Sequence, residues 1–448
     1  MAGLTIGNPA TLIQALASQR IYSGDTLELL PGTYTGDYII PFSGHDTQPI
    51  TIKAHTPGTV TIDGSFSFYG KNFIVDGLEF TRTDWQTRTF SSSQNIKPNI
   101  YVGGSNIKIR NCIIHDGNEC IESFGGGVTE LYGCLMYNGG YILNGGGVGH
   151  SIYTHNTGGI YNLYENNIFL ASFNYGFHAH SSGANYIKNY HLKNNIFGKC
   201  NQKHTFGNDS GGIDYAVEDI LFEYNENMNT WWWFNRWTNP ARNIIVRNNY
   251  FTGYGTDYNN VDQGCCSFKT YDEIDCQNNV FANQSARLIR VKLPAGATQY
   301  TFGLNTYYSP DVSGVFMGQS DALLDFAGWE AEIGDTGSTI SDWPPPDRIR
   351  VIPNVYDANR CHVAIYNFSG SDNVVVDVSA IYQPDEVIKV HQAQDFYNDI
   401  QTLTVAQDGT ITIDMRAIVH SNAIPIGHNQ TIDPLMCPYR GAFVVEKA

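Results

Sequence analysis

The chain has 448 residues, of which 13% are aromatic and 15% charged, with 45 glycines and a formal net charge of -17. Few charged residues and abundant glycine and aromatic side chains favour an all-β protein, because helices usually carry more Glu, Lys and Ala. The acidic balance argues against a nucleic-acid partner, whose phosphates need clustered Lys and Arg, and the lack of any run of about 18 apolar residues argues against a membrane span.

The N-terminal residues predict a short helix followed by strands. The start MAGLTIGNPA has neither a basic nor a long apolar segment, so no signal peptide is expected. The stretch NPATLIQALAS, residues 8–18, predicts a helix with Asn8 as N-cap and Pro9 in the first turn. We expect this helix to cover the open edge of the first coil. Residues 24–36 and 50–64 then alternate strand and turn patterns.

A short motif recurs along the next part of the chain. It reads RNCII at 110, ENNIF at 165, KNNIF at 193, RNNYF at 247 and QNNVF at 277. Each copy follows a short alternating segment, which is typical of a solenoid of β coils with loops of unequal length. The repeated Asn predicts a ladder of side-chain amides at one turn of the coils.

With these features the chain resembles the right-handed parallel β-helix proteins of the pectate-lyase-like type. The segment SGDTLELLPGTY and the Asn-Asn-aromatic repeat carry the resemblance, which covers about residues 8–310. It implies an all-β fold, a right-handed parallel β-helix. It leaves the function open, because this fold hosts lyases, epimerases, hydrolases and phage tail proteins.

The C-terminal part predicts a second unit. Three prolines at 344–346 predict a stiff linker. The strand patterns beyond it, with turn signals at short spacing, predict a small β-sandwich. Residues 311–343 are expected to be a connector with a little helix. We therefore expect a β-helix domain over residues 1–343 and a β-sandwich domain over residues 344–448.

Aligning the second strand of each coil on its apolar residue predicts two outward columns about 4.8 Å apart from rung to rung. The residues taken as inward are Ile121, Ile152, Phe177, Phe206, Phe234, Phe268 and Ile289. The first outward column would hold Glu122, Tyr153, His178, Gly207, Asn235, Lys269 and Arg290. The second would hold Phe124, His155, His180, Asp209, Trp237, Tyr271 and Lys292.

These columns form a polar strip that suits an extended polymer. The stretch TWWWFNRW adds tryptophans at its side, and aromatic rings are good platforms for sugar faces. The tryptophans and the arginine of this stretch are Trp231, Trp232, Trp233, Arg236 and Trp237. The predicted substrate-binding residues are Glu122, Trp233, Asn235, Arg236, Trp237, Lys269, Tyr271, Arg290 and Lys292.

The strip holds the residue types that β-elimination or C5-epimerisation of a uronate polymer requires. A base removes the proton next to the carboxylate, and a cation stabilises the enolate that develops. We assign proton transfer to His180 and His155, the role of partner acid or base to Tyr153, and orientation to His178. Asp209 completes the predicted catalytic set. Lys269 and Arg290 would bind the carboxylate of the substrate.

The stretch YGFHAHS, residues 175–181, also resembles a motif of the β-helical mannuronan C5-epimerases, Tyr-Gly-x-Asp-Pro-His-Asp. Tyr175, Gly176 and His180 match it. His178 and Ser181 replace its two aspartates, and Ala179 replaces its proline. The resemblance therefore implies where the site lies, and not which reaction it performs.

Two other functions stay open. Glycoside hydrolysis needs two carboxyls about 5 Å apart, or about 6.5 to 9.5 Å apart for inversion. Glu122 and Asp209 lie three rungs apart in the predicted register, roughly 14 Å, so a pair would need Asp209 with Asp214, Asp257 or Asp262.

The other alternative is a phage tail or cell-surface protein that only binds glycans. The reaction products distinguish these three functions. A lyase produces unsaturated ends, a hydrolase produces reducing ends without unsaturation, and a glycan-binding protein produces neither.

The expected partner is a polysaccharide, with neither nucleic acid nor membrane. No cofactor is certain. Calcium could bind at Asp and Glu clusters, and His155, His178 and His180 together could bind a transition metal, although no metal site is assigned. The expected location is extracellular or virion-associated. The sequence gives no indication of oligomeric state.

Overall fold

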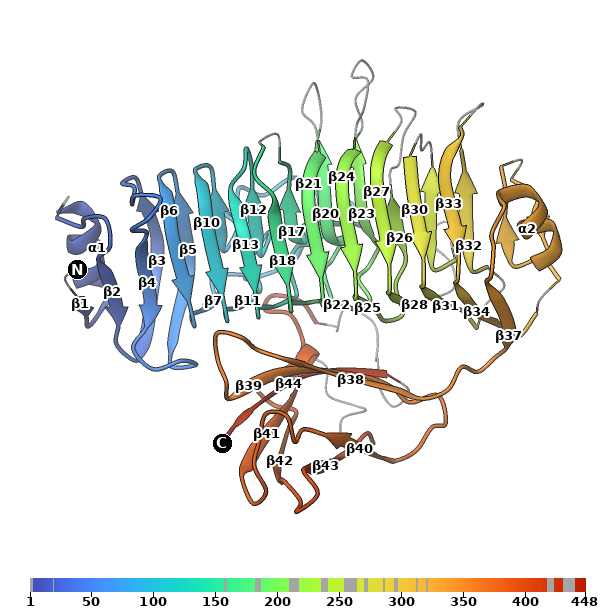
Figure 1. Ribbon diagram of the computed structural model, residues 1–448. Helices are drawn as coiled ribbons and strands as arrows, with labels where there is room; N and C mark the ends of the chain where they lie inside the picture. The colour runs from blue at the N-terminus through green and yellow to red at the C-terminus, as the bar shows by residue number, and fades with distance from the viewer. Residues whose placement is uncertain are drawn as a thin grey trace.

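The computed structural model describes residues 3–18, 20–156, 159–181, 187–208, 217–234, 241–253, 264–269, 273–284, 287–293, 297–311, 313–319, 321–416, 423–429 and 440–448. Most of these residues belong to short strands that follow one another in coils stacked along one axis, so the chain is a parallel β-helix (Figure 1). Strands of successive coils pair in parallel and form three faces.

The first face is a parallel sheet. Its described strands are β1 (Gly3–Ile6), β2 (Thr26–Leu29), β4 (Ile50–Ala54), β6 (Lys71–Asp76), β10 (Ser105–Arg110), β13 (Val128–Tyr132), β18 (Asn162–Glu165), β21 (Ile187–Lys193), β24 (Val217–Glu223), β27 (Ala241–Arg247), β30 (Glu273–Gln277) and β33 (Gln299–Gly303). The second face comprises β7 (Glu79–Thr81), β11 (Ile113–His115), β14 (Leu135–Tyr137), β19 (Ile168–Phe169), β22 (Ile196–Phe197), β25 (Glu226–Asn227), β28 (Tyr250–Thr252), β31 (Val280–Ala282), β34 (Thr306–Ser309) and β37 (Thr339–Asp342).

The third face carries the strands on which the polar strip was predicted. It comprises β9 (Ile100–Val102), β12 (Ile121–Ser123), β17 (His150–Thr154), β20 (Tyr175–Ser181), β23 (His204–Asn208), β26 (Trp232–Phe234), β29 (Cys266–Lys269), β32 (Ile289–Lys292) and β35 (Phe316–Met317), to which β36 (Leu323–Leu324) pairs antiparallel. The long strands β3 (Gly32–Ile40) and β5 (Val60–Phe68) pair along their whole length, and β5 reaches both β7 and β9. They therefore join the second and third faces.

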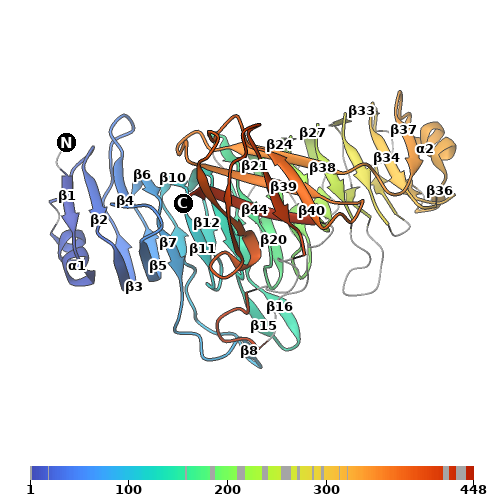
Figure 2. The same ribbon diagram turned by 90° about the horizontal axis from the view of Figure 1, so that it is seen from below.

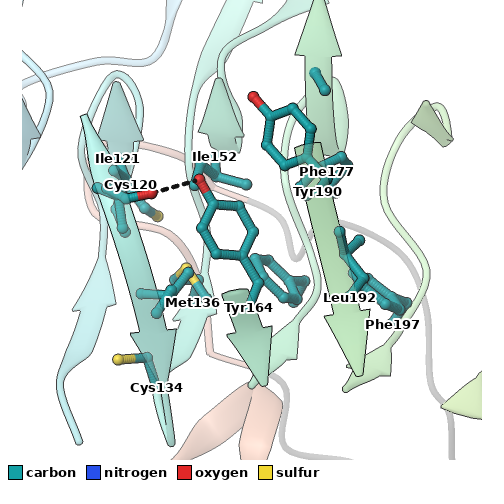
Figure 3. Packing of buried hydrophobic residues seen from close by; sticks show 14 of the residues in the cluster. Cys120, Ile121, Cys134, Met136, Ile152, Tyr164, Phe177, Tyr190, Leu192 and Phe197 are labelled. Carbon is teal, nitrogen blue, oxygen red and sulfur yellow. Dashed lines mark hydrogen bonds between the residues drawn. The ribbon is translucent and has the colours of Figure 1, made fainter. Parts of the chain in front are cut away.

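The interior of the stack is filled by the inward side chains of all three faces. On the third face Ile121 pairs with Ile152 and Ile152 with Phe177, and all three are buried (Figure 3). One coil cannot bury these side chains alone, so the core exists only because the coils stack.

An asparagine ladder closes the turn between the first and second faces, as the repeat predicted. The first Asn of each pair has positive φ, for example 56° at Asn166 and 58° at Asn248, which Asn tolerates better than most residues. The second Asn is buried and donates its amide to the next Oδ1 at 3.0 to 3.2 Å. This ladder runs through Asn167, Asn195, Asn225, Asn249, Asn279 and Asn305.

A helix lies at each end of the stack (Figure 1). Helix α1 (Pro9–Ala17) begins as predicted, with the Asn8 side chain accepting from Thr11 N and Pro9 in its first turn, and it buries Leu12 and Leu16 in the core. Helix α2 (Phe326–Ile333) lies in the predicted connector, and its buried Trp329 stacks on Phe316 at 4.9 Å. No described helix is both long and apolar enough to cross a bilayer.

The C-terminal strands form two antiparallel sheets with one apolar core. The larger sheet contains β38 (Arg348–Pro353), β39 (Arg360–Tyr366), β44 (Arg440–Lys447), β41 (Val387–Gln392) and β42 (Ile400–Thr404), the smaller one β40 (Asn373–Asp377) and β43 (Thr410–Asp414), and a short 3-10 turn, η1, spans Ala393–Asp395. This unit packs against the second face (Figures 1 and 2), where apolar residues such as Leu135 and Ile196 contact Ile352 and Val444 in one cluster.

One buried ion pair fixes the C-terminal unit to the stack. Glu226 on β25 is fully buried and pairs with Arg348 at 2.7 Å and Arg350 at 3.1 Å.

A small side sheet of β8 (Thr89–Phe90), β15 (Tyr141–Leu143) and β16 (Gly146–Val148) projects from the stack in Figure 2. The described contacts between the stack and the C-terminal sheets lie at the second face and at the asparagine turn before it.

Candidate active site

The third face carries two outward columns of side chains. The described first column is Tyr101, Glu122, Tyr153, His178, Thr205, Trp233, Ser267 and Arg290. The second column lies two residues further along each strand and includes Phe124, His155, His180, Gly207, Lys269 and Lys292. Tyr153, His155, His178 and His180 therefore share one outer surface, as predicted.

The predicted register was wrong by two residues from β23 to β29. Phe206 lies opposite Ala179 rather than Phe177, so Thr205, Trp233 and Ser267 occupy the first column in place of Gly207, Asn235 and Lys269. Likewise Phe268 lies opposite Val291, not Ile289, which sets Lys269 beside Lys292 rather than Arg290. A slip of two residues leaves the outward face unchanged, because side chains alternate with a period of two.

Part of the predicted site lies outside the described residues. This applies to Asp209, Asn235, Arg236, Trp237 and Tyr271. It applies also to Asp214, Asp257 and Asp262, the carboxylates that were to pair with Asp209.

A hydrogen-bonded relay leads from a carboxylate to the strip. The Nδ1 atom of His150 lies 2.7 Å from Oε2 of Glu119, and its Nε2 atom lies 2.9 Å from Nδ1 of His178. All three side chains are buried. Donation of Nδ1–H from His150 to Glu119 leaves Nε2 of His150 to accept from Nδ1–H of His178.

Sequence reasoning missed Glu119 and His150, although the sequence holds a signal for both. Glu119 precedes the inward Ile121 by two residues, and His150 precedes the inward Ile152 by two. Equal offsets in consecutive coils make residues vertical neighbours, as the pairing of Ile121 with Ile152 implies.

Three further rings, of Tyr153, His180 and Tyr175, complete the cluster. The hydroxyl of Tyr153 lies 3.4 Å from Nδ1 of His180, and the rings of His178 and His180 lie 4.9 Å apart. Tyr175 stacks on His178 at 4.3 Å and on His150 at 5.6 Å. The half-buried Tyr153 and His180 face solvent more than His178 does. These two are therefore the groups best placed to touch a substrate.

Burial shifts the pKa of two groups beside this cluster. The pKa of the Glu122 carboxyl is raised to about 7, mainly by burial and in addition by the charge of Glu119, while His150 opposes the change. Burial lowers the pKa of His155, and the charge of His180 lowers it too. His155 also stacks on Phe124 at 4.6 Å. Near neutral pH the site thus holds a largely neutral His155 and a Glu122 that is protonated about half of the time.

Lys203 is a further residue that the sequence reasoning missed. It is buried, and its Nζ atom lies 3.4 Å from the ring centroid of Trp233, 4.6 Å from that of Trp231 and 5.2 Å from that of Tyr175. Such cation–π contacts stabilise a buried ammonium. The expectation for the tryptophans was wrong in one respect, since Trp232 is fully buried in the core and Trp231 is nearly so.

The cationic residues that were predicted to bind substrate, Lys269, Arg290 and Lys292, lie apart from the imidazole cluster. Arg290 and Lys292 both pair with Asp321, at 2.8 Å and 2.7 Å. They stand four rungs from His180, roughly 19 Å away by rung spacing, and Lys269 stands three rungs away. The structure therefore does not bring Lys269, Arg290 or Lys292 to the imidazoles.

A metal site is not apparent in the described ranges, which contain no group of three or more His, Cys, Asp or Glu side chains arranged to hold an ion. His155, His178 and His180 do not form such a group, although all three lie in those ranges.

Comparisons with known proteins give one family match and several structural likenesses. Residues 7–123 match the family model of chondroitinase B. No curated protein sequence matches the chain. A mannuronic acid specific polysaccharide family 6 lyase from human gut microbiota is 13% identical, with a TM-score of 0.38 over 77% of this chain and 92% of that one.

Two further solved structures are similar to a comparable degree. The A-module of a mannuronan C-5 epimerase from Azotobacter vinelandii is 13% identical, with a TM-score of 0.42 over 75% of this chain and 94% of that one. A family 28 exopolygalacturonase from Yersinia enterocolitica is 13% identical, with a TM-score of 0.43 over 77% and 79% of the two chains. TM-scores this low carry no argument about the reaction or substrate of this chain.

Proposed function

We propose that the chain is a polysaccharide-acting enzyme, and that it is a lyase which cleaves a uronate polymer by β-elimination on the third face. The observation that carries this proposal is the hydrogen-bonded series Glu119–His150–His178 beside the Tyr153–His180 pair. Two proton-transfer groups supported by a buried carboxylate are what elimination needs, since one group takes a proton and another returns one.

In the proposed reaction Tyr153 and His180 are the catalytic residues. One of the two removes the proton next to the substrate carboxylate, and the other protonates the glycosidic oxygen that leaves. The electron pair of the broken C–H bond forms the new C=C bond as the C–O bond breaks. His178 is a positioning residue, because it lies against His180 and its orientation is set through His150 by Glu119.

In this proposal Glu122 contacts the substrate carboxylate, a role that was predicted for Lys269 and Arg290. It is the first-column neighbour of Tyr153, and burial raises its pKa to about 7. A protonated carboxyl does not repel a uronate carboxylate and can donate a hydrogen bond to it, which stabilises the enolate that develops. The match to the chondroitinase B family over residues 7–123 includes Glu119 and Glu122 and supports the same class of reaction.

Glycoside hydrolysis is the second candidate, and one observation favours it. Glu119 and Glu122 are two carboxyls close enough for the charge of one to raise the pKa of the other, while Glu119 is held by His150. A carboxyl with a raised pKa, here Glu122, near a second carboxyl is the pattern of an acid and a second carboxylate in glycosidases. Its weakness is that Glu119 is buried behind His150.

Product analysis tests both candidates. Polymannuronate, polygalacturonate and chondroitin would be incubated with the protein, and unsaturated ends measured by ultraviolet absorbance alongside reducing ends. A lyase gives both signals together. Reducing ends without unsaturation would overturn elimination in favour of hydrolysis. Neither signal on any polymer would overturn both and favour a glycan-binding protein.

The same proposal extends to architecture and location. We propose that the coils wind right-handed, that α1 caps the first coil, and that the two C-terminal sheets are a β-sandwich domain starting at residue 344. Limited proteolysis of the full chain tests the boundary, since first cleavage away from residues 343–347 would contradict it. We also place the enzyme's action outside the cell. Neither the family match nor the structural likenesses support a virion-associated role.

A further inference from the structure

A row of aromatic rings leads away from the imidazole cluster toward the N-terminal end of the stack. Tyr69 lies 5.7 Å from Tyr101, Tyr101 lies 6.4 Å from Phe124, and Phe124 lies 5.5 Å from Tyr153, each measured between ring centroids. Tyr101 and Tyr153 belong to the first outward column. Tyr69 and Phe124 lie two residues beyond the paired positions Ser67 and Glu122, and so belong to the second. The rings therefore alternate between the two columns, one ring per rung.

The far end of this aromatic row is open to solvent. Tyr69 is 59% exposed, and Tyr101 and Phe124 are half-buried. A row of large rings that stays accessible over several rungs is unlike a core ladder, which excludes water. The row thus has free ring surface to offer a ligand.

A surface pocket of about 280 Å³ lies beside Tyr69 and is lined largely by glycines, among them Gly70, Gly103 and Gly104. Gly103 occupies the second-column position on β9, where a Cβ atom would come within 3.1 Å of the Tyr101 ring. The missing side chain leaves room between Tyr69 and Phe124. Lys71 lies at the same pocket and adds a positive charge.

In the described part of the opposite direction, Arg290 and Lys292 are already paired with Asp321, and Lys269 is a further cation of the second outward column. The exposed ring of Tyr69, with Lys71 at the same pocket, favours the N-terminal side for a polymer that extends from His180.

We propose that Tyr69, Tyr101 and Phe124 form a row of sugar-binding subsites for a linear uronate polysaccharide that runs along the stack axis from His180 toward α1. Sugar rings would pack on the aromatic faces, with one carboxylate near Lys71. From β5 to β20 the row spans four rungs, roughly 19 Å by rung spacing. This inference rests on the proposed function, because it names the substrate-binding path of the same site.

Two variants test the row. Tyr69→Ala removes an exposed ring, with Tyr22→Ala, a 67% exposed tyrosine elsewhere, as control. Gly103→Asp sets a negative charge in the pocket, and Gly103→Asn is its control of equal size and equal crowding against Tyr101. Binding of polymannuronate, polygalacturonate and chondroitin is measured by calorimetry, and KM and kcat are measured wherever turnover occurs.

We expect Tyr69→Ala to weaken polymer binding about tenfold, from loss of one stacked ring, with kcat unchanged. Gly103→Asp should weaken binding well beyond Gly103→Asn, and Tyr22→Ala should change nothing. Binding unaffected by Tyr69→Ala and equal for the Asp and Asn variants would overturn the inference even if the polymer is cleaved. Failure of the wild-type protein to bind all three polymers would overturn it too. Binding that depends on Tyr69 without any turnover would overturn the proposed lyase function and leave the row in place.

Discussion

The asparagine ladder offers a direct measure of what holds the coils in register. Replacing Asn225 by Ala removes an oxygen that accepts from the backbone N–H of Asn195 at 2.9 Å and from its side-chain amide at 3.0 Å. It also removes the amide that donates to the carbonyl of Leu192 at 2.9 Å. All these groups lie in the dry turn, since Asn195 and Asn225 are fully buried. Water therefore cannot replace the lost partners.

The magnitude follows from the groups left without partners. The side-chain amide of Asn195 still donates to the carbonyl of Tyr164, so the free energy lost at this amide is small. The backbone N–H of Asn195 and the carbonyl of Leu192 each lose a buried hydrogen bond, at about 1 to 3 kcal/mol apiece. We therefore expect Asn225→Ala to lower the free energy of unfolding by about 2 to 6 kcal/mol.

Urea denaturation followed by far-ultraviolet circular dichroism measures this loss. The matched control is Asn248→Gly, one position before ladder residue Asn249, where φ is 58° and glycine fits without strain. The control should shift the midpoint little. A loss of less than about 1 kcal/mol for Asn225→Ala, or an equal loss for both variants, would refute the claim that the side-chain ladder stabilises the turn.

Two further changes test charges in the structure. The raised pKa of Glu122 means that its contribution to stability is fully present below its ordinary pKa of 4.5 and is lost as pH rises through about 7. As pH rises between these values, the free energy of unfolding of Glu122→Gln should therefore increase relative to that of the wild-type protein. The shift in pKa sets an upper bound of about 3 kcal/mol, and solvent screening reduces the expected difference to about 1 to 2 kcal/mol. A difference in urea midpoint that does not depend on pH would contradict this. Glu226→Ala leaves Arg348 and Arg350 without their carboxylate at the contact with the C-terminal unit. These two side chains are 38% and 20% exposed, so solvent should reduce the cost of about 3 to 5 kcal/mol for a fully buried charge to about 2 to 3. Arg242→Ala, which breaks an exposed pair with Glu218, should cost less than about 1 kcal/mol; equal thermal stabilities of the two variants would contradict a stabilising role of the buried Glu226.

The stacking of coils could be predicted because the sequence repeats its own turn chemistry. Asn-Asn before an apolar pair marks the turn at Asn166, Asn194, Asn248 and Asn278, where only few residue types accept positive φ. The same reasoning found α1, since Asn8 and Pro9 are local signals that no tertiary contact overrides.

Register was harder to predict, because it depends on volume across the whole core. Matching large apolar residues set Phe206 opposite Phe177, whereas the structure sets it opposite the small Ala179. The core is filled by the sum of all three faces, so a small residue on one strand is compensated by large ones elsewhere, such as the buried Trp232. One strand's pattern does not contain that information.

Part of the arrangement at the candidate site could be predicted, while the roles of its residues stay predictions. Period-two alternation correctly set Tyr153, His178 and Glu122 on one surface, because that inference needs only local geometry. Glu119 and His150 were missed because Glu119 precedes β12 by two residues and His150 is the first residue of β17, and strand alternation is least informative at such positions. The predicted columns already set Arg290 four rungs from His178, so its distance from the imidazoles could have been read from the sequence, and the structure has the same number of rungs.

The central claim is that Tyr153 and His180 transfer protons in an elimination reaction. The most direct test follows formation of unsaturated uronate by ultraviolet absorbance for the wild-type protein, His180→Ala, Tyr153→Phe and the control His55→Ala, which changes an exposed histidine on the first face. The account predicts that both site variants lose about 10² to 10⁴-fold in kcat and that the control does not. Full activity of His180→Ala and Tyr153→Phe on a polymer that the wild-type protein cleaves would contradict it.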